Sequence, residues 1–290
     1  MSRVRHDLVT RLWRGRDPFL DLPSDLPSDL REVDMRGASQ GHAFIGPAVA
    51  AAHPGIVVDV GAGKGGSTIA FARELRNGRM NAVVVAVDTF LGDVSSWSND
   101  EEFEGMEYEA GRSSLYPRFV GNILQAGLGS FVLPLTLDAT TAAALFARFG
   151  IPASIVHLDA GHDPGSIRAY LEAWWPLLAP GGVLIGGPCA DGQDASNQAY
   201  EAFFAAQGVQ ATFQDGKCQA IKPAAEGSNE SPKAARVFRL GGHPLARAPG
   251  DPPLQAAATE PAAAETSDEP PKTARVFRLG GRPVARREET

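Results

Sequence analysis

Four glycines within six residues are the clearest chemical feature of this 290-residue chain. They are Gly61, Gly63, Gly65 and Gly66 in the segment VVDVGAGKGGS, which joins an apolar run to a helix-like stretch. Glycine adopts positive φ angles and lets a ligand approach the backbone closely. The helix that follows offers free N–H groups, which suit a pyrophosphate or a carboxylate. The segment therefore predicts a binding loop for a ligand that carries one of these anions.

Two aspartates near the loop support competing interpretations of its ligand. The first, second and fourth glycines fit G-x-G-x-x-G, and Asp88 follows 22 positions after the last of them, as in a dinucleotide site. Asp59, however, stands two residues before Gly61, where its carboxylate would repel a pyrophosphate. With the first three glycines it makes the pattern D-x-G-x-G-x-G. That position suits a ligand with an ammonium group.

Further polar residues follow the later apolar runs. Asp88 and Thr89 follow VVVAV, Asp138 follows VLPLTL, and Asp159 and His162 follow IVHL. A carboxylate can accept hydrogen bonds from a ligand, and a neutral imidazole near its ordinary pKa can remove a proton from a hydroxyl group. Asp138 is equally suited to capping the helix expected after it. These residues predict a polar ligand-binding site at the carboxyl ends of the strands.

The elements that must position these residues alternate between short apolar runs and amphipathic stretches. We expect strands at 56–60, 82–88, 131–135, 154–159 and 182–187, with helices at 67–77, 116–126, 140–149 and 165–178. Such strands are typical of a parallel sheet that helices cover on both faces. After a helix near 194–206, the runs 209–214 and 217–221 flank Asp215-Gly216, a preferred hairpin turn. The fold class is therefore α/β, with a doubly wound, mostly parallel seven-stranded sheet and an antiparallel C-terminal hairpin.

The chain divides into three expected parts. Residues 1–50 form an N-terminal extension and lid, 51–222 form the α/β domain, and 223–290 form a low-complexity tail. The tail carries two copies of one motif at 233–247 and 272–286, which read KAARVFRLGGHPLAR and KTARVFRLGGRPVAR. Its composition favours a disordered segment, whereas the repeated Val-Phe-x-Leu core would suit pairing with a protein partner. Both interpretations stay open.

Composition excludes several classes of function. The net charge of −7 argues against a nucleic-acid surface, and no apolar run approaches the length of a membrane span. The spacing of Cys189 and Cys218 supports neither a metal site nor a pair of thiols, so we expect a reducing, cytoplasmic location. The expected partner is a small molecule. A homo-oligomer is compatible with the sequence.

Residues from about 33 to 222 resemble the class I S-adenosylmethionine-dependent methyltransferases. The resemblance rests on VVDVGAGKGGSTIAFA, VVAVDTFLGDVSSW, IVHLDAGHDPGSIRAYLEAWWPLL and APGGVLIGG. Within this family the chain looks most like the group of macrocin and mycinamicin sugar O-methyltransferases and their cephalosporin-biosynthesis relatives. The resemblance implies methyl transfer from S-adenosylmethionine to an oxygen of a small molecule, such as a sugar or a secondary metabolite.

The resemblance also implies a role for each polar residue. Asp59 would face the ammonium group of the cofactor directly or through water, Asp88 would accept both ribose hydroxyls, and Asp138 would meet the adenine amino group. His162 would be the general base. The implied cofactor-binding residues are Asp59, Gly61, Gly63, Gly65, Asp88, Thr89, Asp138 and Asp159. The stretch 93–116 would form a lid or acceptor wall, and residues 41–44 would close the other side.

The chain departs from this family directly after the fifth strand. In metal-dependent relatives the residue matching Asp159 binds a divalent cation, and an acidic pair follows the fifth strand. Here the sequence reads Gly187-Pro188-Cys189-Ala190, and Asp191 follows. Because Mg²⁺ needs several oxygen ligands, three outcomes stay open. The metal is lost, Asp191 completes a site with Asp159, or the chain binds S-adenosylmethionine without catalysis. An NAD-dependent oxidoreductase remains a further alternative, which rests on the glycine spacing alone.

Overall fold

The computed structural model of the chain describes residues 2–19, 41–108, 111–161, 163–189 and 195–224. The chain divides into two compact units, Met1–Phe238 and Arg239–Thr290. The second unit and both copies of the repeated motif lie outside the described residues, as does the expected disordered tail. None of the helices in the described ranges is long and apolar enough to cross a membrane.

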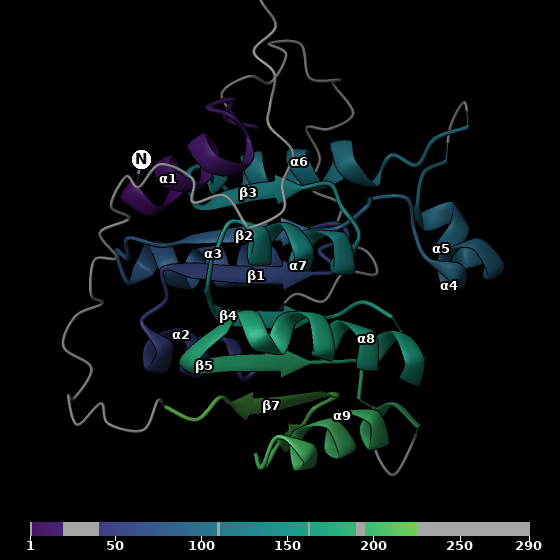
Figure 1. Cartoon of the computed structure of the whole chain (residues 1–290). Helices are drawn as coiled ribbons and strands as arrows, with labels where there is room; N and C mark the ends of the chain where they lie inside the picture. The colour runs from purple at the N-terminus through teal and green to yellow at the C-terminus, as the bar shows by residue number, and fades with distance from the viewer. Residues whose placement is uncertain (1, 20–40, 109–110, 162, 190–194, 225–290) are drawn as a thin grey trace, which may run out of the picture. The chain divides into compact units, whose positions relative to one another are not determined.

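A seven-stranded sheet forms the centre of the described part (Figure 1). Its strands are β1 (Ile56–Val60), β2 (Val83–Val87), β3 (Val132–Leu135), β4 (Ala153–Leu158), β5 (Leu178–Gly186), β6 (Thr212–Gln214) and β7 (Lys217–Ile221). They lie in the order β3-β2-β1-β4-β5-β7-β6. The first five are parallel, and β7 is antiparallel to both of its neighbours. The predicted doubly wound sheet with its antiparallel hairpin is confirmed.

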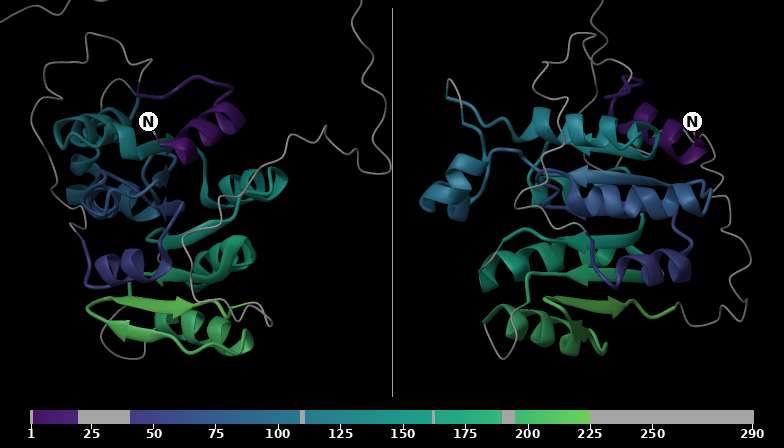
Figure 2. Two further views of the ribbon diagram at one scale, coloured as in Figure 1. Left: turned by 90° about the vertical axis from the view of Figure 1, so that its left-hand side faces the viewer. Right: turned by 180° about the vertical axis from the view of Figure 1, so that it is seen from behind.

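Helices cover both faces of this sheet, as the left view of Figure 2 shows. One face packs against α2 (Ile45–Ala52), α3 (Gly66–Asn77) and α6 (Leu115–Gln125). The other packs against α7 (Ala139–Arg148), α8 (Pro164–Trp174) and α9 (Ala195–Ala206). Successive residues of a strand face opposite sides, so Val57 joins the first cluster while Val58 and Val60 join the second. This double burial explains why the strands read as almost unbroken apolar runs.

An N-terminal helix that the sequence patterns did not indicate completes the core. In α1 (Arg3–Leu12), Leu8 and Val9 pack into the cluster with α7 and α8. Arg5 is buried and pairs with Asp17 at 2.7 Å, and its Nη1 atom donates to the carbonyl oxygen of Val132 at 2.5 Å. These contacts tie α1 to the start of β3. The partners of this buried arginine lie far from it in the sequence. The local sequence pattern of the segment therefore does not indicate the helix.

Two short helices occupy the expected lid region. They are α4 (Val94–Ser98) and α5 (Asp100–Gly105), and the side chains of Asp93 and Asn99 cap their first turns. Figure 1 shows both helices beyond the carboxyl ends of the parallel strands. Elsewhere the expected bounds differ from the structure by at most one residue, with three exceptions. The strand β5 begins at Leu178, four residues earlier than expected, β6 begins at Thr212, three residues later, and α8 ends at Trp174, four residues earlier. A register shift against β4 and the positive φ of Gly181 accommodate the irregular start of β5.

Candidate active site

The sheet brings the predicted residues together at one edge. The strand order reverses between β1 and β4, and open α/β sheets bind ligands at the carboxyl ends of such strands. The backbone N–H of Gly61 donates to Val87 at 2.9 Å, and that of Asp159 donates to Val60 at 2.9 Å. The glycine loop, Asp88 and Asp159 therefore follow three adjacent strands. Asp138 follows β3 at the same edge.

Three of the four glycines have positive φ: the fold requires two of them, and the third faces open space. Gly61 has φ +84°, and a Cβ atom there would lie 2.7 Å from the carbonyl carbon of Asp159. Gly65 caps α3 with φ +94°, and a Cβ atom would lie 3.1 Å from the Phe119 ring. Gly63 also has a positive φ of +48°, but no heavy atom lies within 4 Å of its Cβ position. A ligand can therefore approach the backbone most closely at Gly63.

Asp59 lies beneath the loop and is fully buried. The Ser67 hydroxyl donates to both of its oxygens, at 2.9 and 3.1 Å, and the Thr68 hydroxyl also donates to it. Nδ1 of His157 lies 2.7 Å from Oδ1 of Asp59 on the neighbouring strand. Asp59 thus holds α3 against β1 and β4 and presents no accessible surface. The side chain points under α3, so this burial does not suit the direct contact with an ammonium group, and the contact through water stays a prediction.

Asp88 links the loop to the end of β2. Its two oxygens accept hydrogen bonds from the N–H groups of Gly63 at 2.8 Å and Phe90 at 2.7 Å. Burial raises the pKa of the Asp88 carboxyl, these two donors oppose the shift, and the charges of Asp59 and Asp93 reinforce it. The following Thr89 is exposed, whereas Phe90 packs on the rings of α6. Phe90 is therefore a core residue.

Asp138 is the N-cap of α7. Its Oδ1 atom accepts from the hydroxyl of Thr140 at 2.6 Å and from the N–H groups of Thr140 and Thr141, both at 3.0 Å. The hydrogen bonds from Thr140 and Thr141 hold the pKa of Asp138 well below its usual range. All three bonds end on Oδ1, so the cap does not require Oδ2. The capping role and an adenine contact therefore remain compatible.

Asp159 is paired with a lysine that the sequence did not point to. Nζ of Lys217, the first residue of β7, forms an ion pair with Oδ1 of Asp159. Lys217 is buried, with 7% of its surface exposed. The other expected metal ligand, Asp191, and the expected base, His162, both lie outside the described residues. Among the residues that the structure describes, no three His, Cys, Asp or Glu side chains group as metal ligands. The described side chains do not fit a divalent cation.

The hairpin also brings the two cysteines, which are both free, close to each other. Both thiols are buried and reduced. Burial raises the pKa of Cys218 well above its ordinary value, and the hydrogen bond and charge of Cys189 add to the shift. Cys218 is opposite Gly186 in the sheet, and the N–H of Cys189 donates to Gly216 at 2.7 Å. Only strand register, which sequence spacing does not show, makes them neighbours.

Three aromatic rings gather in the lid region. Trp97 lies 5.6 Å from Phe103 and 5.2 Å from Tyr108 between ring centroids, and the latter two are 5.4 Å apart. Trp97 is 53% exposed and donates through Nε1 to the carbonyl oxygen of Leu91 at 3.0 Å. The cluster presents apolar surface beyond the carboxyl edge of the sheet. On another side, Nε2 of His42 lies 3.0 Å from the carbonyl oxygen of Gln214, next to the hairpin turn.

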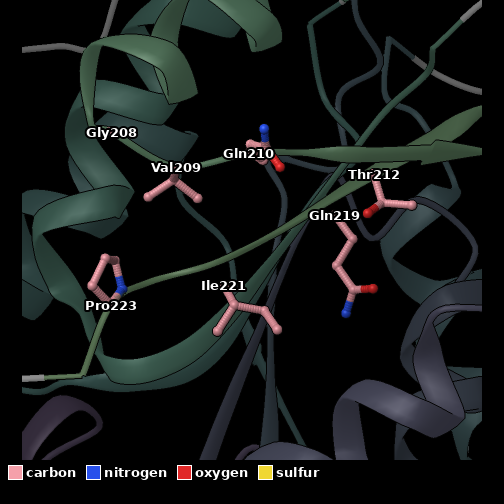
Figure 3. Close-up of a pocket in the computed structure, with 7 residues that line it drawn as sticks. All are labelled: Gly208, Val209, Gln210, Thr212, Gln219, Ile221 and Pro223. Carbon is pink, nitrogen blue, oxygen red and sulfur yellow. The ribbon is translucent and has the colours of Figure 1, made fainter.

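A separate hollow of about 340 Å³ lies on the hairpin (Figure 3). Val209, Thr212, Gln219 and Ile221 are among its lining residues. None of the predicted cofactor-binding residues lines it. The hollow is therefore distinct from the site at the glycine loop.

Comparison with known proteins gives a family match and similar solved structures. Residues 58–187 match the family model of a methyltransferase domain. No curated protein shows a significant match. The O-methyltransferase TomG from Streptomyces achromogenes, solved with S-adenosylmethionine, is 17% identical with a TM-score of 0.46. An O-methyltransferase from Bacillus cereus, solved with S-adenosylhomocysteine, is 19% identical with a TM-score of 0.45.

Each of these two alignments covers 77% of this chain and 91% of the other chain. Identities and scores at this level carry no argument about substrate or mechanism. The expected nearness to the macrocin and mycinamicin group is not confirmed by any of these comparisons. The segment 58–187, which is less than half of the chain, is similar to a methyltransferase domain.

Proposed function

We propose that the chain transfers a methyl group from S-adenosylmethionine to a hydroxyl oxygen of a small molecule. The observation that carries this proposal is the open Gly63 backbone held by Asp88 at the switch point of the sheet, within the segment that matches a methyltransferase domain. A glycine facing open space beside a carboxylate suits a ligand with both backbone-binding and hydroxyl groups.

The residues present fit this cofactor. An ionised carboxylate has about four acceptor positions, so Asp88 can keep its bonds to Gly63 and Phe90 and still accept two ribose hydroxyls. The three hydrogen bonds from Thr140 and from the N–H of Thr141 end on Oδ1 of Asp138, so its carboxylate has further acceptor positions for the adenine amino group. In this proposal Asp59 acts from below, by fixing the first turn of α3. When bound, the cofactor supplies an electrophilic methyl group on a sulfonium.

The acceptor hydroxyl must lose its proton while its oxygen forms the new C–O bond and the C–S bond breaks. We propose His162 as the base, since a neutral imidazole can take that proton near neutral pH. The exposed Trp97 and Tyr108 rings support an acceptor with an apolar or ring-shaped body, such as a sugar or a secondary metabolite. A cytoplasmic location, a homo-oligomer and a protein partner for the repeated tail remain proposals. The negative charge favours neither nucleic acid nor an anionic membrane as partner.

Calorimetric titration of the full chain with S-adenosylhomocysteine and with NADH tests the cofactor. We expect binding of S-adenosylhomocysteine alone, loss of that binding in Asp88→Ala, and unchanged binding in Asp7→Ala, a control on α1. Preferential binding of NADH would establish the oxidoreductase instead. Turnover against a library of hydroxyl compounds then separates an enzyme from a protein that only binds the cofactor.

A further inference from the structure

The charge at the end of β4 is balanced by the protein itself. We propose that Lys217 supplies the positive charge at the acceptor end of the site, so that methyl transfer by this chain proceeds without a bound divalent cation. The part of the proposal that concerns methyl transfer rests on the proposed function. The pairing of Asp159 with an ammonium group does not depend on that function. Four observations at the carboxyl edge of the sheet support the proposal.

The first observation is the direction of the hairpin. Because β7 runs antiparallel to β5, its first residue lies at the edge where β4 and β5 end. Lys217 follows the turn at Asp215-Gly216, while Asp159 directly follows β4. Their side chains meet across the end of β5, and Nζ of Lys217 pairs with Oδ1 of Asp159. The fold thus delivers an ammonium group to the ligand-binding edge.

The second observation is the glycine that separates them. Gly187 is the first residue after β5, and a Cβ atom there would lie 2.8 Å from Nζ of Lys217. Its N–H donates to Leu158 at 2.9 Å, so the backbone itself has little freedom to move away. This is the segment where the resemblance leads one to expect an acidic pair. Because residue 187 is glycine, it brings no carboxylate to this edge. The Lys217 side chain occupies the space that a Cβ atom at residue 187 would fill, and so reaches Asp159.

The third observation is burial. A buried ammonium is costly unless it is paired and hydrogen-bonded, and at 7% exposure Lys217 depends on a carboxylate partner. A divalent cation at Asp159 would stand beside this ammonium and be repelled by it. The fourth observation is the absence of any grouping of three metal-ligating side chains among the described residues.

Positive charge beside the acceptor oxygen favours the proposed methyl transfer. As the proton leaves the acceptor hydroxyl, negative charge develops on its oxygen, and a fixed cation in a water-poor site stabilises that charge. An ammonium has three N–H donors, so Lys217 can hold Asp159 and still donate to an oxygen at the edge. The C–O bond forms as the C–S bond breaks, and the acceptor proton passes to the base, as in the proposed transfer. No metal-bound species takes part.

Titration with Mn²⁺, followed by electron paramagnetic resonance and by thermal unfolding, tests the proposal on the full chain with S-adenosylhomocysteine present. The wild type should bind no Mn²⁺ in a manner that depends on Asp159, and its melting temperature should be equal in Mn²⁺ and in chelator. Wild-type Mn²⁺ binding that Asp159→Asn abolishes would overturn the proposal. Failure to bind S-adenosylhomocysteine would overturn the proposed function. The comparison of Mn²⁺ binding between the wild type and Asp159→Asn would still show whether Asp159 holds a cation.

Variants of the lysine separate charge supply from folding. Lys217→Met should lower turnover of an acceptor found in the library by roughly 10²-fold while leaving cofactor affinity within a few-fold. The double variant Lys217→Met, Asp159→Asn should regain melting temperature, because no unpaired carboxylate remains, but not turnover. Lys222→Met, at the other end of the same hairpin, is the control and should turn over normally. Wild-type turnover in Lys217→Met would overturn the proposal.

Discussion

Nδ1 of His157 lies 2.7 Å from Oδ1 of Asp59, across two neighbouring strands and directly under the glycine loop. The same carboxylate accepts hydrogen bonds from Ser67 and Thr68 in the first turn of α3. The position of the loop therefore depends on one buried acid that joins β1, β4 and α3. Such a network rigidifies a site when every member is satisfied, and it is costly to break.

Removing this acid should destabilise the fold. Asp59→Ala should lower the free energy of unfolding by about 3 kcal/mol or more, because it leaves a histidine and two hydroxyls without their buried partner. Asp7→Ala, which breaks a partly exposed ion pair on α1, should cost less than about 1 kcal/mol. Urea unfolding followed by circular dichroism measures both. An Asp59→Ala protein as stable as the wild type, but unable to bind cofactor, would show that Asp59 contacts the ligand.

Two glycines of the loop should give opposite results. Gly61→Ala places a Cβ atom against the backbone of Asp159 and should cost more than about 2 kcal/mol of stability. Gly63→Ala meets no atom and should cost only about 1–2 kcal/mol for its left-handed backbone. It should nevertheless weaken S-adenosylhomocysteine binding at least 10-fold, because the methyl group projects into the open side of the loop. Equal cofactor affinity in Gly63→Ala and the wild type would place the ligand elsewhere.

Asp88 should make cofactor binding sensitive to acid. The ribose hydroxyls donate to the ionised carboxylate, so affinity should fall as pH drops through the Asp88 pKa, which burial raises above 3.8. The effect on folding has the opposite sign. A raised pKa means that the stability contributed by the protonated form is full below the unfolded pKa and is lost as pH rises through the folded one. Calorimetry between about pH 7.5 and about pH 4.5 should show the affinity loss in the wild type and a flat profile in Asp88→Asn.

Asp138 should stabilise the fold only above its own titration range. The hydrogen bonds from Thr140 and Thr141 lower its pKa, so its contribution is present above the unfolded pKa of 3.8 and is lost as pH falls towards the folded one. Asp138→Ala should cost about 1 kcal/mol at neutral pH, the usual value of an N-cap. The difference from the wild type should shrink in strong acid. A constant difference across the pH range, measured by thermal unfolding, would contradict the capping role.

Much of the fold was predictable because local patterns and tertiary structure agree. Each of the first five apolar runs forms one of the parallel strands β1 to β5. Asp215-Gly216 marks the turn of the hairpin. The helix α1 was not predictable, because its place depends on a buried pair between Arg5 and Asp17 and on a carbonyl in β3. The helices α4 and α5 are shorter than the windows in which helical periodicity can be recognised.

The location of the candidate site was predictable because the carboxyl ends of parallel strands lie at the same edge of the sheet. That rule alone brings the loop, Asp88 and Asp159 together. It does not say which way a side chain points, so it does not show that Asp59 lies fully buried under the loop. Nor does it reveal Lys217, a single lysine in the polar hairpin segment QDGKCQ. Only the antiparallel pairing of β7 with β5 brings this residue to Asp159.

The proposed base gives the last prediction. His162→Ala should lower turnover roughly 10²-fold or more and leave S-adenosylhomocysteine affinity nearly unchanged, since the imidazole takes the acceptor proton and is not needed to hold the cofactor. His53→Ala, at the exposed end of α2, is the matched control and should behave as the wild type. Single-turnover rates with the same acceptor should fall in His162→Ala alone and stay at the wild-type level in His53→Ala. An unchanged rate would remove His162 from the mechanism and leave bulk water to accept the proton.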